Sequence, residues 1–399
     1  MNKISQNEKL NDLRVVLVDF YGSGHHESYL QALVTNMDKL DISYLVIGPS
    51  SLTNRIDSHK LCLLKDSEQL VGLNGIKRQI IIYHLCRQSI DIANNFGATH
   101  IHFVYVDWIL SGLVKAWFSK TPKAIPIITV HWGGGVGIGG RFKDKFRQLP
   151  NRLAFIWFTK KTNTRVLVHH KSIVDELSKI VDKDKIGIIP YPATPLKIMT
   201  QLKIINFRRS IGISDNITLL LCYGNTRFDK GADLAVRALK YLPKEYHLLV
   251  VGSPQKFQPQ DLYNLANKDG TKERLHIIPR FISEEETALV FYSCEIVLIP
   301  YRRFFSGQSG PLTLAAAIGK PVVVADLPVL KATVQEFRLG FVFPAEDILA
   351  MTEALLTTAN WKPASDDTAK FVNQHSSSSF TNSVLVNYLL SCKEKNETN

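Results

Sequence analysis

Two glycine-bearing segments follow apolar runs, and the first of them could hold an anion. This segment is Gly22-Ser23-Gly24-His25-His26-Glu27. Glycines let a backbone approach a ligand closely, and the N-terminus of the helix that follows favours a phosphate. A dinucleotide fingerprint would need a glycine where Glu27 stands and an acidic residue where Gly48 ends the next apolar run. A hydride-transfer enzyme is therefore disfavoured, and a tight strand–helix turn is the alternative interpretation.

A histidine closes another apolar run and opens the second glycine-bearing segment. His131 belongs to PIITVHW, and six glycines follow within residues 133–140. Functional groups of α/β folds gather at the carboxyl ends of strands, so His131 could act as a general base or donate a hydrogen bond to a sugar or phosphate. His25 and Asp107 (in YVDW) are the other predicted bases, with His131 preferred to His25. A structural histidine is the alternative.

The second half of the chain offers positive charge beside a predicted strand. Arg227 and Lys230 lie in GNTRFDKG, after ITLLLCYG and before ADLAVRALKYL. A fixed cation at such a loop can neutralise a diphosphate and the charge that develops on a departing leaving group. Ordinary surface residues are the alternative.

A second loop of this half begins a predicted helix. In FSGQSGPL (305–312), Pro311 suits the first turn, and Ser309 or Gly310 suits the cap. The N–H groups of such a helix start face outward and favour an anion. Plain helix capping is the alternative.

Residues 140–165 combine positive charge with aromatic side chains. Eight Lys and Arg residues stand against Asp144 alone, interleaved with Phe142, Phe146, Phe155, Trp157 and Phe158. This pattern suits an anionic membrane surface. A solvated helix face with a packed aromatic side is the alternative, and no nucleic-acid module is recognisable.

The elements that must position these groups alternate along the chain. Apolar strand-like runs at 14–20, 43–48, 99–106, 126–132, 165–170 and 185–190 are separated by amphipathic stretches, and six more runs lie between 217 and 343. Such alternation predicts two doubly wound, parallel-sheet α/β domains facing a cleft. We expect the domains to cover 1–200 and 201–375, a loop at 364–379, and a last helix at 379–394.

Composition excludes several classes of protein. The 399 residues are 45% hydrophobic and 21% charged, as in an ordinary globular protein. The five cysteines show no metal or disulfide spacing, which favours a reducing compartment. No signal peptide or membrane span is visible, so we expect a cytoplasmic protein. The net charge of +12 is uneven, since residues 1–195 hold 25 basic and 16 acidic residues and the rest hold 23 and 20. An anionic partner is therefore expected at the first half.

The second half resembles the nucleotide-binding domain of GT-B glycosyltransferases, in the group of bacterial mannosyl- and glucosyltransferases and glycogen-synthase-like enzymes. The resemblance is carried by YGNTRFDKGADLAVRAL, HLLVVG, the run from LHIIPRF to PVVVADLP, and GFVFPAED. The first half is similar more loosely, through YGSGHHESYLQAL, TVHW, RVLVHHKSIVDEL and IIPYP.

The resemblance implies two Rossmann-like domains, with the last helix (379–394) packing back on the first domain. It also implies the transfer of a sugar from a nucleotide-sugar donor to a hydroxyl acceptor. It implies that Lys230 contacts the donor diphosphate, with Arg227 nearby, that Gly22 and Gly24 lie near the phosphates, and that His131 faces the cleft. Many members carry two glutamates eight positions apart. Ser306 and Leu314 stand at those positions here.

This departure leaves the ribose to be held differently, and we predict Ser309, Gly310 and Leu312 as substrate-binding residues. It also leaves open whether the reaction inverts or retains the anomeric configuration. An inverting enzyme would need one of the bases above, and a retaining enzyme would not.

The sequence therefore predicts a metal-independent glycosyltransferase with no bound cofactor. We expect a lipid-linked or polysaccharide acceptor in cell-surface glycan synthesis, and peripheral contact of residues 140–165 with the inner face of the plasma membrane. Nucleic acid is not an expected partner. The alternative function is a glycosyltransferase-like scaffold that has lost catalysis.

Overall fold

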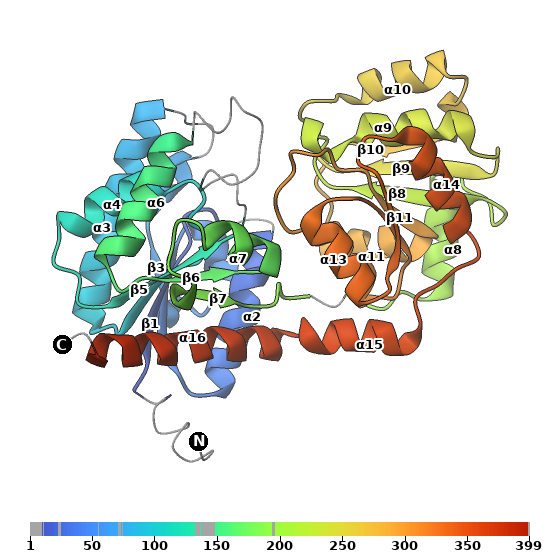
Figure 1. Ribbon diagram of the computed structural model, residues 1–399. Helices are drawn as coiled ribbons and strands as arrows, with labels where there is room; N and C mark the ends of the chain where they lie inside the picture. Colours follow the sequence, from blue (N-terminus) through green and yellow to red (C-terminus); the bar gives the residue numbers. More distant parts are fainter. Residues whose placement is uncertain are drawn as a thin grey trace. The chain divides into compact units, whose positions relative to one another are not determined.

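The computed structural model describes residues 10, 12–22, 25–54, 56–70, 73, 75–131, 136, 148–193 and 196–397 (Figure 1). The chain divides into two compact units. Unit 1 comprises residues 1–192 and 375–399, and unit 2 comprises residues 193–374. The sequence had indicated a boundary at 200/201. Residues 193–200 belong with unit 2 instead, because Ala193 and Leu196 pack into its hydrophobic core.

Unit 1 is built on a seven-stranded sheet with the order β3-β2-β1-β4-β5-β6-β7. Every described pairing is parallel. The strands are β1 (Arg14–Val18), β2 (Ser43–Gly48), β3 (Leu61–Leu63), β4 (His100–Phe103), β5 (Ile125–Val130), β6 (Arg165–Val168) and β7 (Ile186–Ile188). The inner strands are apolar throughout because helices cover both faces. The short edge strand β3 was not predicted, since LCL is too brief a run to stand out.

Two apolar clusters lie on opposite faces of this sheet. One joins the strands to α3 (Gly75–Phe96), α4 (Leu110–Phe118), α6 (Leu149–Lys161) and α7 (Lys171–Leu177). The other joins them to α2 (His25–Lys39) and to α16 (Ser377–Glu397), the last helix of the chain, which packs beside α2 (Figure 1). Unit 1 is thus closed by a segment distant from it in sequence.

Buried polar contacts fix α16 on the sheet. The ring of His102 lies 2.7 Å from both the Tyr388 hydroxyl and the Thr129 hydroxyl. Arg165 Nε donates to Asn387 Oδ1 at 2.6 Å. Burial lowers the pKa of His102 to about 3, so its ring is neutral and can both donate and accept. These pairs specify one register for the helix, because a shift would leave buried polar groups unpaired.

Unit 2 is built on a six-stranded parallel sheet with the order β10-β9-β8-β11-β12-β13. Its strands are β8 (Thr218–Tyr223), β9 (Tyr246–Val251), β10 (Leu275–Ile278), β11 (Ile296–Ile299), β12 (Val322–Ala325) and β13 (Gly340–Phe343). Its helices are α8 (Gln201–Ser210), α9 (Ala232–Ala238), α10 (Pro259–Lys268), α11 (Glu284–Ser293), α12 (Gly310–Ala317), α13 (Pro328–Glu336), α14 (Ile348–Thr358) and α15 (Ser365–Gln374). The two doubly wound, parallel α/β units confirm the predicted fold class.

The loop expected at 364–379 was wrong, because residues 365–374 form α15 and residues from 377 belong to α16. Ser, Asp and Thr suggested a loop, but Asp366 and Asp367 lie in the first turn of α15, where acidic side chains favour the helix dipole. Phe371 is fully buried against unit 2 and anchors the helix. No helix within the described ranges has the length and apolar character needed to cross a bilayer.

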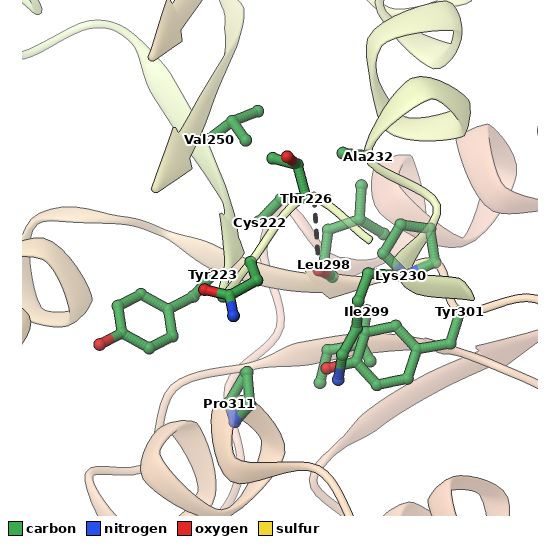
Figure 2. Close-up of a pocket in the computed structure, with 13 residues that line it drawn as sticks. Cys222, Tyr223, Thr226, Lys230, Ala232, Val250, Leu298, Ile299, Tyr301 and Pro311 are labelled. Carbon is green, nitrogen blue, oxygen red and sulfur yellow. Dashed lines mark hydrogen bonds between the residues drawn. The ribbon is translucent and has the colours of Figure 1, made fainter. Parts of the chain in front are cut away.

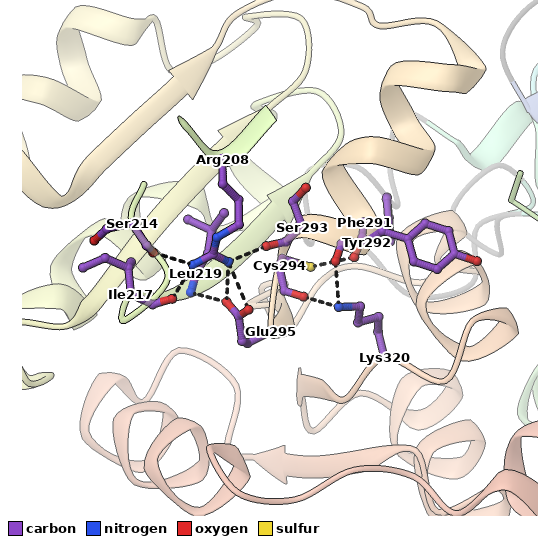
Figure 3. A network of polar contacts seen from close by, with 10 residues as sticks. All are labelled: Arg208, Ser214, Ile217, Leu219, Phe291, Tyr292, Ser293, Cys294, Glu295 and Lys320. Atoms are coloured by element: carbon purple, nitrogen blue, oxygen red, sulfur yellow. Dashed lines mark hydrogen bonds and ion pairs between the residues drawn. The ribbon is translucent and has the colours of Figure 1, made fainter. Parts of the chain in front are cut away.

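One arginine joins several segments at the amino-terminal edge of the unit 2 sheet (Figure 3). Arg208 of α8 is buried and donates to the carbonyl groups of Ser293 at 2.8 Å, Ser214 at 2.9 Å and Ile217 at 2.6 Å. It also contacts the Glu295 carboxylate at 3.0 Å, and that carboxylate accepts the Leu219 N–H at 2.7 Å. Arg208 thereby holds the starts of β8 and β11 together, on the edge opposite to their carboxyl ends.

Replacing Arg208 by Met is expected to lower the free energy of unfolding of unit 2 by about 3 kcal/mol, because buried carbonyl groups lose their donor at about 1–3 kcal/mol each. Arg209→Met is the matched control, since Arg209 is exposed on the same helix. It should change stability by less than about 0.5 kcal/mol. Urea denaturation followed by circular dichroism measures both. Equal destabilisation by the two variants would contradict the role given to Arg208.

Candidate functional site

A pocket opens in unit 2 where β8 and β11 end and α12 begins (Figure 2). Its lining includes Tyr223 and Thr226 after β8, Tyr301 after β11, and Pro311 in the first turn of α12. Lys230 reaches it from a short 3-10 turn, η6 (Phe228–Lys230). Parallel strands place these segments together, because their carboxyl ends lie at one edge of the sheet.

Glycines shape the backbone around this pocket. Gly231 follows Lys230 with φ of 68°, and a Cβ atom there would lie 2.0 Å from the Pro300 carbonyl oxygen. Gly252 ends β9 with φ of 144°, and a Cβ atom there would lie 2.3 Å from the Gly224 carbonyl oxygen. Only glycine satisfies both conditions at these positions. The loops after β8, β9 and β11 are therefore packed backbone against backbone, which fixes the direction of Lys230.

Lys230 lies over two aromatic rings. Its ammonium nitrogen Nζ is 3.7 Å from the ring centroid of Tyr301 (Figure 2) and 4.5 Å from that of Phe305. Burial and, to a lesser extent, the charge of the nearby Arg227 lower the pKa of Lys230 to about 7, while Asp229 acts in the opposite direction. Within the described part of the chain, no hydrogen bond or ion pair joins Lys230 to an acidic side chain. The neighbouring acid, Asp229, is bonded to Arg227, so the ammonium group of Lys230 stays accessible to an anion that enters the pocket.

Arg227 forms an ion pair with an acidic residue instead of lining the pocket. Its Nε donates to Asp229 Oδ1 at 2.9 Å, and its Nη2 contacts Asp229 Oδ2. Its side chain is 45% exposed. The structure therefore brings Lys230 to the pocket and pairs Arg227 with an acid two residues away. A ligand-binding role for Arg227 stays a prediction.

The predicted helix start is confirmed at α12, whose cap uses two of the predicted residues for local bonds. Ser309 Oγ accepts the Leu312 N–H at 3.3 Å and lies 3.1 Å from the Tyr301 hydroxyl. The Leu312 side chain is buried in the core, so its observed role is structural. Gly310 opens the helix, and a Cβ atom there would meet no other atom within 4 Å. Of the three, Gly310 lies beside open space.

Sequence reasoning missed the ion pair that holds η6. Arg302 is 5% exposed, and its Nη1 and Nη2 contact the Asp233 carboxylate at 3.0 and 2.7 Å. Its guanidinium also lies 3.9 Å from the Phe228 ring centroid, and its backbone N–H donates to Asp229 O at 2.9 Å. Arg302 thus ties the end of β11 to both η6 and α9, and it positions Lys230 indirectly. Nothing in the sequence distinguishes the two arginines after Pro300-Tyr301, and only the fold brings Arg302 to Asp233.

In unit 1, Gly22 lies in the loop after β1 and packs closely against the protein itself, and a ligand-binding role for it stays a prediction. Its φ is 54°, and a Cβ atom would lie 2.5 Å from Pro49 Cγ. Its N–H donates to Asp19 Oδ1 at 3.4 Å, and its carbonyl accepts the Ser51 hydroxyl at 2.9 Å. Gly24 lies outside the described residues, as does the side chain of His25, which begins α2. Their predicted roles stay predictions.

The adjacent histidine is held by a buried carboxylate. His26 Nδ1 lies 2.8 Å from Asp19 Oδ2, and Asp19 is 1% exposed. Burial alone would raise the pKa of Asp19, but the His26 ring and the N–H groups of Tyr21 and Gly22 outweigh it and lower that pKa. Sequence reasoning chose His25 and passed over His26. The signal was available as an Asp at the end of the first strand, seven residues before a histidine on the next helix.

His131 lies at the end of β5, within a cluster of rings. The backbone N–H of His131 donates to Asp107 Oδ2 at 3.0 Å, and the ring Nε2 lies 2.9 Å from Val104 O. The Tyr105 ring stacks on it at 4.7 Å between centroids, and the His169 ring lies at 4.8 Å. Asp107 is fully buried, so its observed role is to cap the end of β5. The structure thus brings His131, Asp107 and the His26 pair to the same edge of the unit 1 sheet.

The basic segment is described from residue 148 onward, and residues 141–147 lie outside the described residues. Three apolar side chains form one stripe on α6: Leu149 is 46%, Leu153 57% and Trp157 44% exposed. Phe118 of α4 extends the stripe, with its ring 4.1 Å from that of Trp157. Lys160 and Lys161 are exposed in the last turn of α6.

Comparison with known proteins identifies the second unit. Residues 218–360 match the family described as glycosyl transferases group 1. An uncharacterized glycosyltransferase of Methanocaldococcus jannaschii is 25% identical over 197 residues, which are 47% of this chain and 48% of that protein. The D-inositol 3-phosphate glycosyltransferase of Xylanimonas cellulosilytica is 28% identical over 150 residues, 37% of this chain and 35% of that protein. The chain thus spans half or less of the length of these two relatives.

A longer match exists at lower identity. The alpha-galactosylglucosyldiacylglycerol synthase of Streptococcus pneumoniae is 21% identical over 291 residues, covering 69% of this chain and 75% of that protein. Among solved structures, Anabaena HepE in complex with UDP has a TM-score of 0.71 at 15% identity, covering 93% of this chain and 98% of HepE. HepE with UDP-glucose has a TM-score of 0.68. The structural likeness shows a shared fold, that of the GT-B glycosyltransferases.

Gly231→Ala is expected to destabilise unit 2 by about 2 kcal/mol more than Gly270→Ala, and to disturb the pocket. Both glycines have φ of 68°, but a Cβ atom at Gly270 would meet no other atom within 4 Å. The two variants therefore share the cost of a left-handed residue, about 1–2 kcal/mol, and only Gly231→Ala adds the clash with Pro300. Thermal unfolding of the pair measures the difference. Similar melting temperatures would show that the backbone contact does not hold this loop.

Proposed function

We propose that the protein is a glycosyltransferase, because residues 218–360 match the family described as glycosyl transferases group 1 and the chain has the GT-B fold. It moves a sugar from a nucleotide-sugar donor to a hydroxyl acceptor. The single observation that carries the proposal is the pocket in unit 2, where Lys230 and the start of α12 together present positive charge to an anion.

The donor diphosphate binds at Lys230 and at the outward N–H groups of the first turn of α12. As the bond between the sugar and the diphosphate breaks, negative charge grows on the leaving phosphate. Lys230 and the helix dipole stabilise that charge better than the charge of the intact donor, which lowers the barrier. Since the chain supplies this positive charge itself, we propose that transfer needs no metal ion or cofactor. The UDP and UDP-glucose bound to HepE make nucleotide sugars the donors to test first.

The acceptor binds at the carboxyl edge of the unit 1 sheet. Aromatic rings there offer apolar faces to a sugar, and the polar groups of His26 and His131 offer hydrogen bonds. In an inverting reaction the acceptor hydroxyl must lose a proton. His26, whose ring is oriented by Asp19, is then placed for that role alongside the residues predicted from sequence.

We further propose that the acceptor is lipid-linked, or a growing polysaccharide at a membrane, and that unit 1 contacts the inner surface of that membrane through α6. Leu149, Leu153 and Trp157 would enter the interface while Lys160 and Lys161 meet anionic headgroups. The name of the Streptococcus pneumoniae relative denotes synthesis of a glycosylated diacylglycerol, which supports a lipid acceptor.

Lys230→Ala should weaken donor binding and lower kcat/KM by about 100-fold or more, because it removes a fixed cation from the leaving group. A thermal-shift screen with UDP-, GDP-, ADP- and TDP-glucose identifies the donor, since a ligand that binds the folded state raises its melting temperature. Calorimetry and release of nucleoside diphosphate then measure affinity and turnover. Lys268→Ala, at an exposed lysine of α10, is the control and should behave as wild type.

Either of two results would contradict this proposal. Full turnover by Lys230→Ala would remove the lysine from the site. Failure of the wild-type protein to bind any nucleotide sugar would favour the alternative of a scaffold that kept the fold and lost catalysis.

Exchanging Leu153 and Trp157 together for Ser should lower partitioning onto vesicles containing phosphatidylglycerol by at least about tenfold, because two apolar side chains leave the interface. Leu356→Ser is the control, since Leu356 is an exposed leucine of α14 in unit 2. Sedimentation with and without anionic lipid, at low and high salt, measures the effect. If the double variant binds the vesicles as well as the wild-type protein does, and salt does not change the binding, α6 is excluded as the membrane contact.

A further inference from the structure

The two ends of one side chain contact the two anion-binding elements of the unit 2 pocket. The ring of Tyr301 lies 3.7 Å from Lys230 Nζ, and its hydroxyl lies 3.1 Å from Ser309 Oγ (Figure 2 shows the ring beside Lys230). Ser309 is the N-cap of α12 and accepts the Leu312 N–H. Tyr301 is 3% exposed, so neither contact competes freely with water.

Phe305 completes the support of the lysine. Its ring lies 4.5 Å from Lys230 Nζ and 4.5 Å from the Tyr301 ring. Aromatic faces attract an ammonium group, but they carry no net charge and leave its charge available to a ligand. A carboxylate in the same place would neutralise the lysine. Ser306, one of the two positions where related chains carry a glutamate, supplies no such group.

We propose that Tyr301 is a positioning residue that aligns Lys230 with the N-terminus of α12, so that a diphosphate entering the pocket is met by both and binds together with a proton. The inference rests on the proposed function of this pocket. It adds the residue that couples the two elements, and a dependence of donor affinity on pH.

The charged groups around Lys230 give the sign of this dependence. Arg227 and Asp229 flank it on η6 and pair with each other. From β11 and β8 it faces Tyr301 and Cys222, and burial raises the pKa of both, so they are neutral at pH 7. Because the pKa of Lys230 is about 7 without ligand, the lysine is partly neutral there. A bound diphosphate raises that pKa, so the complex takes up a proton above pH 7, and affinity falls as pH rises.

The experiment measures the affinity of the donor between pH 6 and 8.5 by isothermal titration calorimetry. The probe is whichever of UDP-, GDP-, ADP- or TDP-glucose binds most tightly in the screen above. Both phosphates of these compounds are esterified, so the probe itself does not titrate near neutral pH. Above the value of about 7, the wild-type Kd should rise by up to about tenfold per pH unit. Titrations in phosphate and in Tris, which differ in heat of protonation, should report uptake of up to one proton.

Variants separate the two ends of Tyr301. Tyr301→Phe keeps the ring and loses the hydroxyl, so the pH dependence should remain while affinity falls by roughly threefold to tenfold, the worth of one hydrogen bond. Tyr301→Leu loses both, so affinity should fall further and the pH dependence should flatten as the lysine gains water. Lys230→Met should abolish the pH dependence. Tyr241→Leu is the control, because Tyr241 is 51% exposed and lies 5.9 Å from Lys240 Nζ in a surface pair of the same kind.

The outcomes are distinguishable. Donor binding with a Kd that does not change with pH, or a Tyr301→Leu variant with wild-type Kd and pH dependence, overturns this inference and leaves the proposed function standing. Absence of binding by every nucleotide sugar overturns both. If Tyr301→Leu fails to fold, Tyr301→Phe and Lys230→Met still decide, because loss of pH dependence in the first or its survival in the second contradicts the proposal.

Discussion

The parallel pairing of buried strands is the constraint on which the rest of this structure depends. A parallel strand must return through a crossover, and here the crossovers are helices that cover both faces of each sheet. The loops that follow the strands of one sheet therefore lie together at its carboxyl edge. The pocket of unit 2 and the ring cluster of unit 1 both lie there, whereas the Arg208 network clamps the opposite edge of unit 2.

In each unit a buried carboxylate holds part of the candidate site in place. In unit 2 the Arg302–Asp233 pair fixes η6 and so the direction of Lys230. In unit 1 Asp19 holds both the loop at Gly22 and the ring of His26. In both cases the carboxylate contacts a side chain of the protein, which is Arg302 in unit 2 and His26 in unit 1. The sites are thus preorganised, which is what stabilisation of a developing charge requires.

Positions 306 and 314 carry Ser and Leu in place of glutamate, and the ammonium group of Lys230 lies against aromatic rings. Lys230 rests on the faces of Tyr301 and Phe305, and Tyr301 also bonds the cap of α12. Aromatic faces hold a cation without neutralising it. Apolar surroundings and positive charge are thereby combined in one place, at the cost of a lowered pKa for the lysine.

What the sequence determined by itself was the fold class, most strands, and two of the loops that line the unit 2 pocket, because period, glycine placement and strand–loop–helix order are local properties. It identified Lys230 and the start of α12 for the same reason. It missed β3, which is three residues long, and α15, whose polar composition hides one buried anchor, Phe371. Only the tertiary structure decided which groups meet: Arg302 with Asp233, Asp19 with His26, and Arg227 with Asp229. Those partners come from separate elements or depend on side-chain direction, and both are set by packing that no local pattern records.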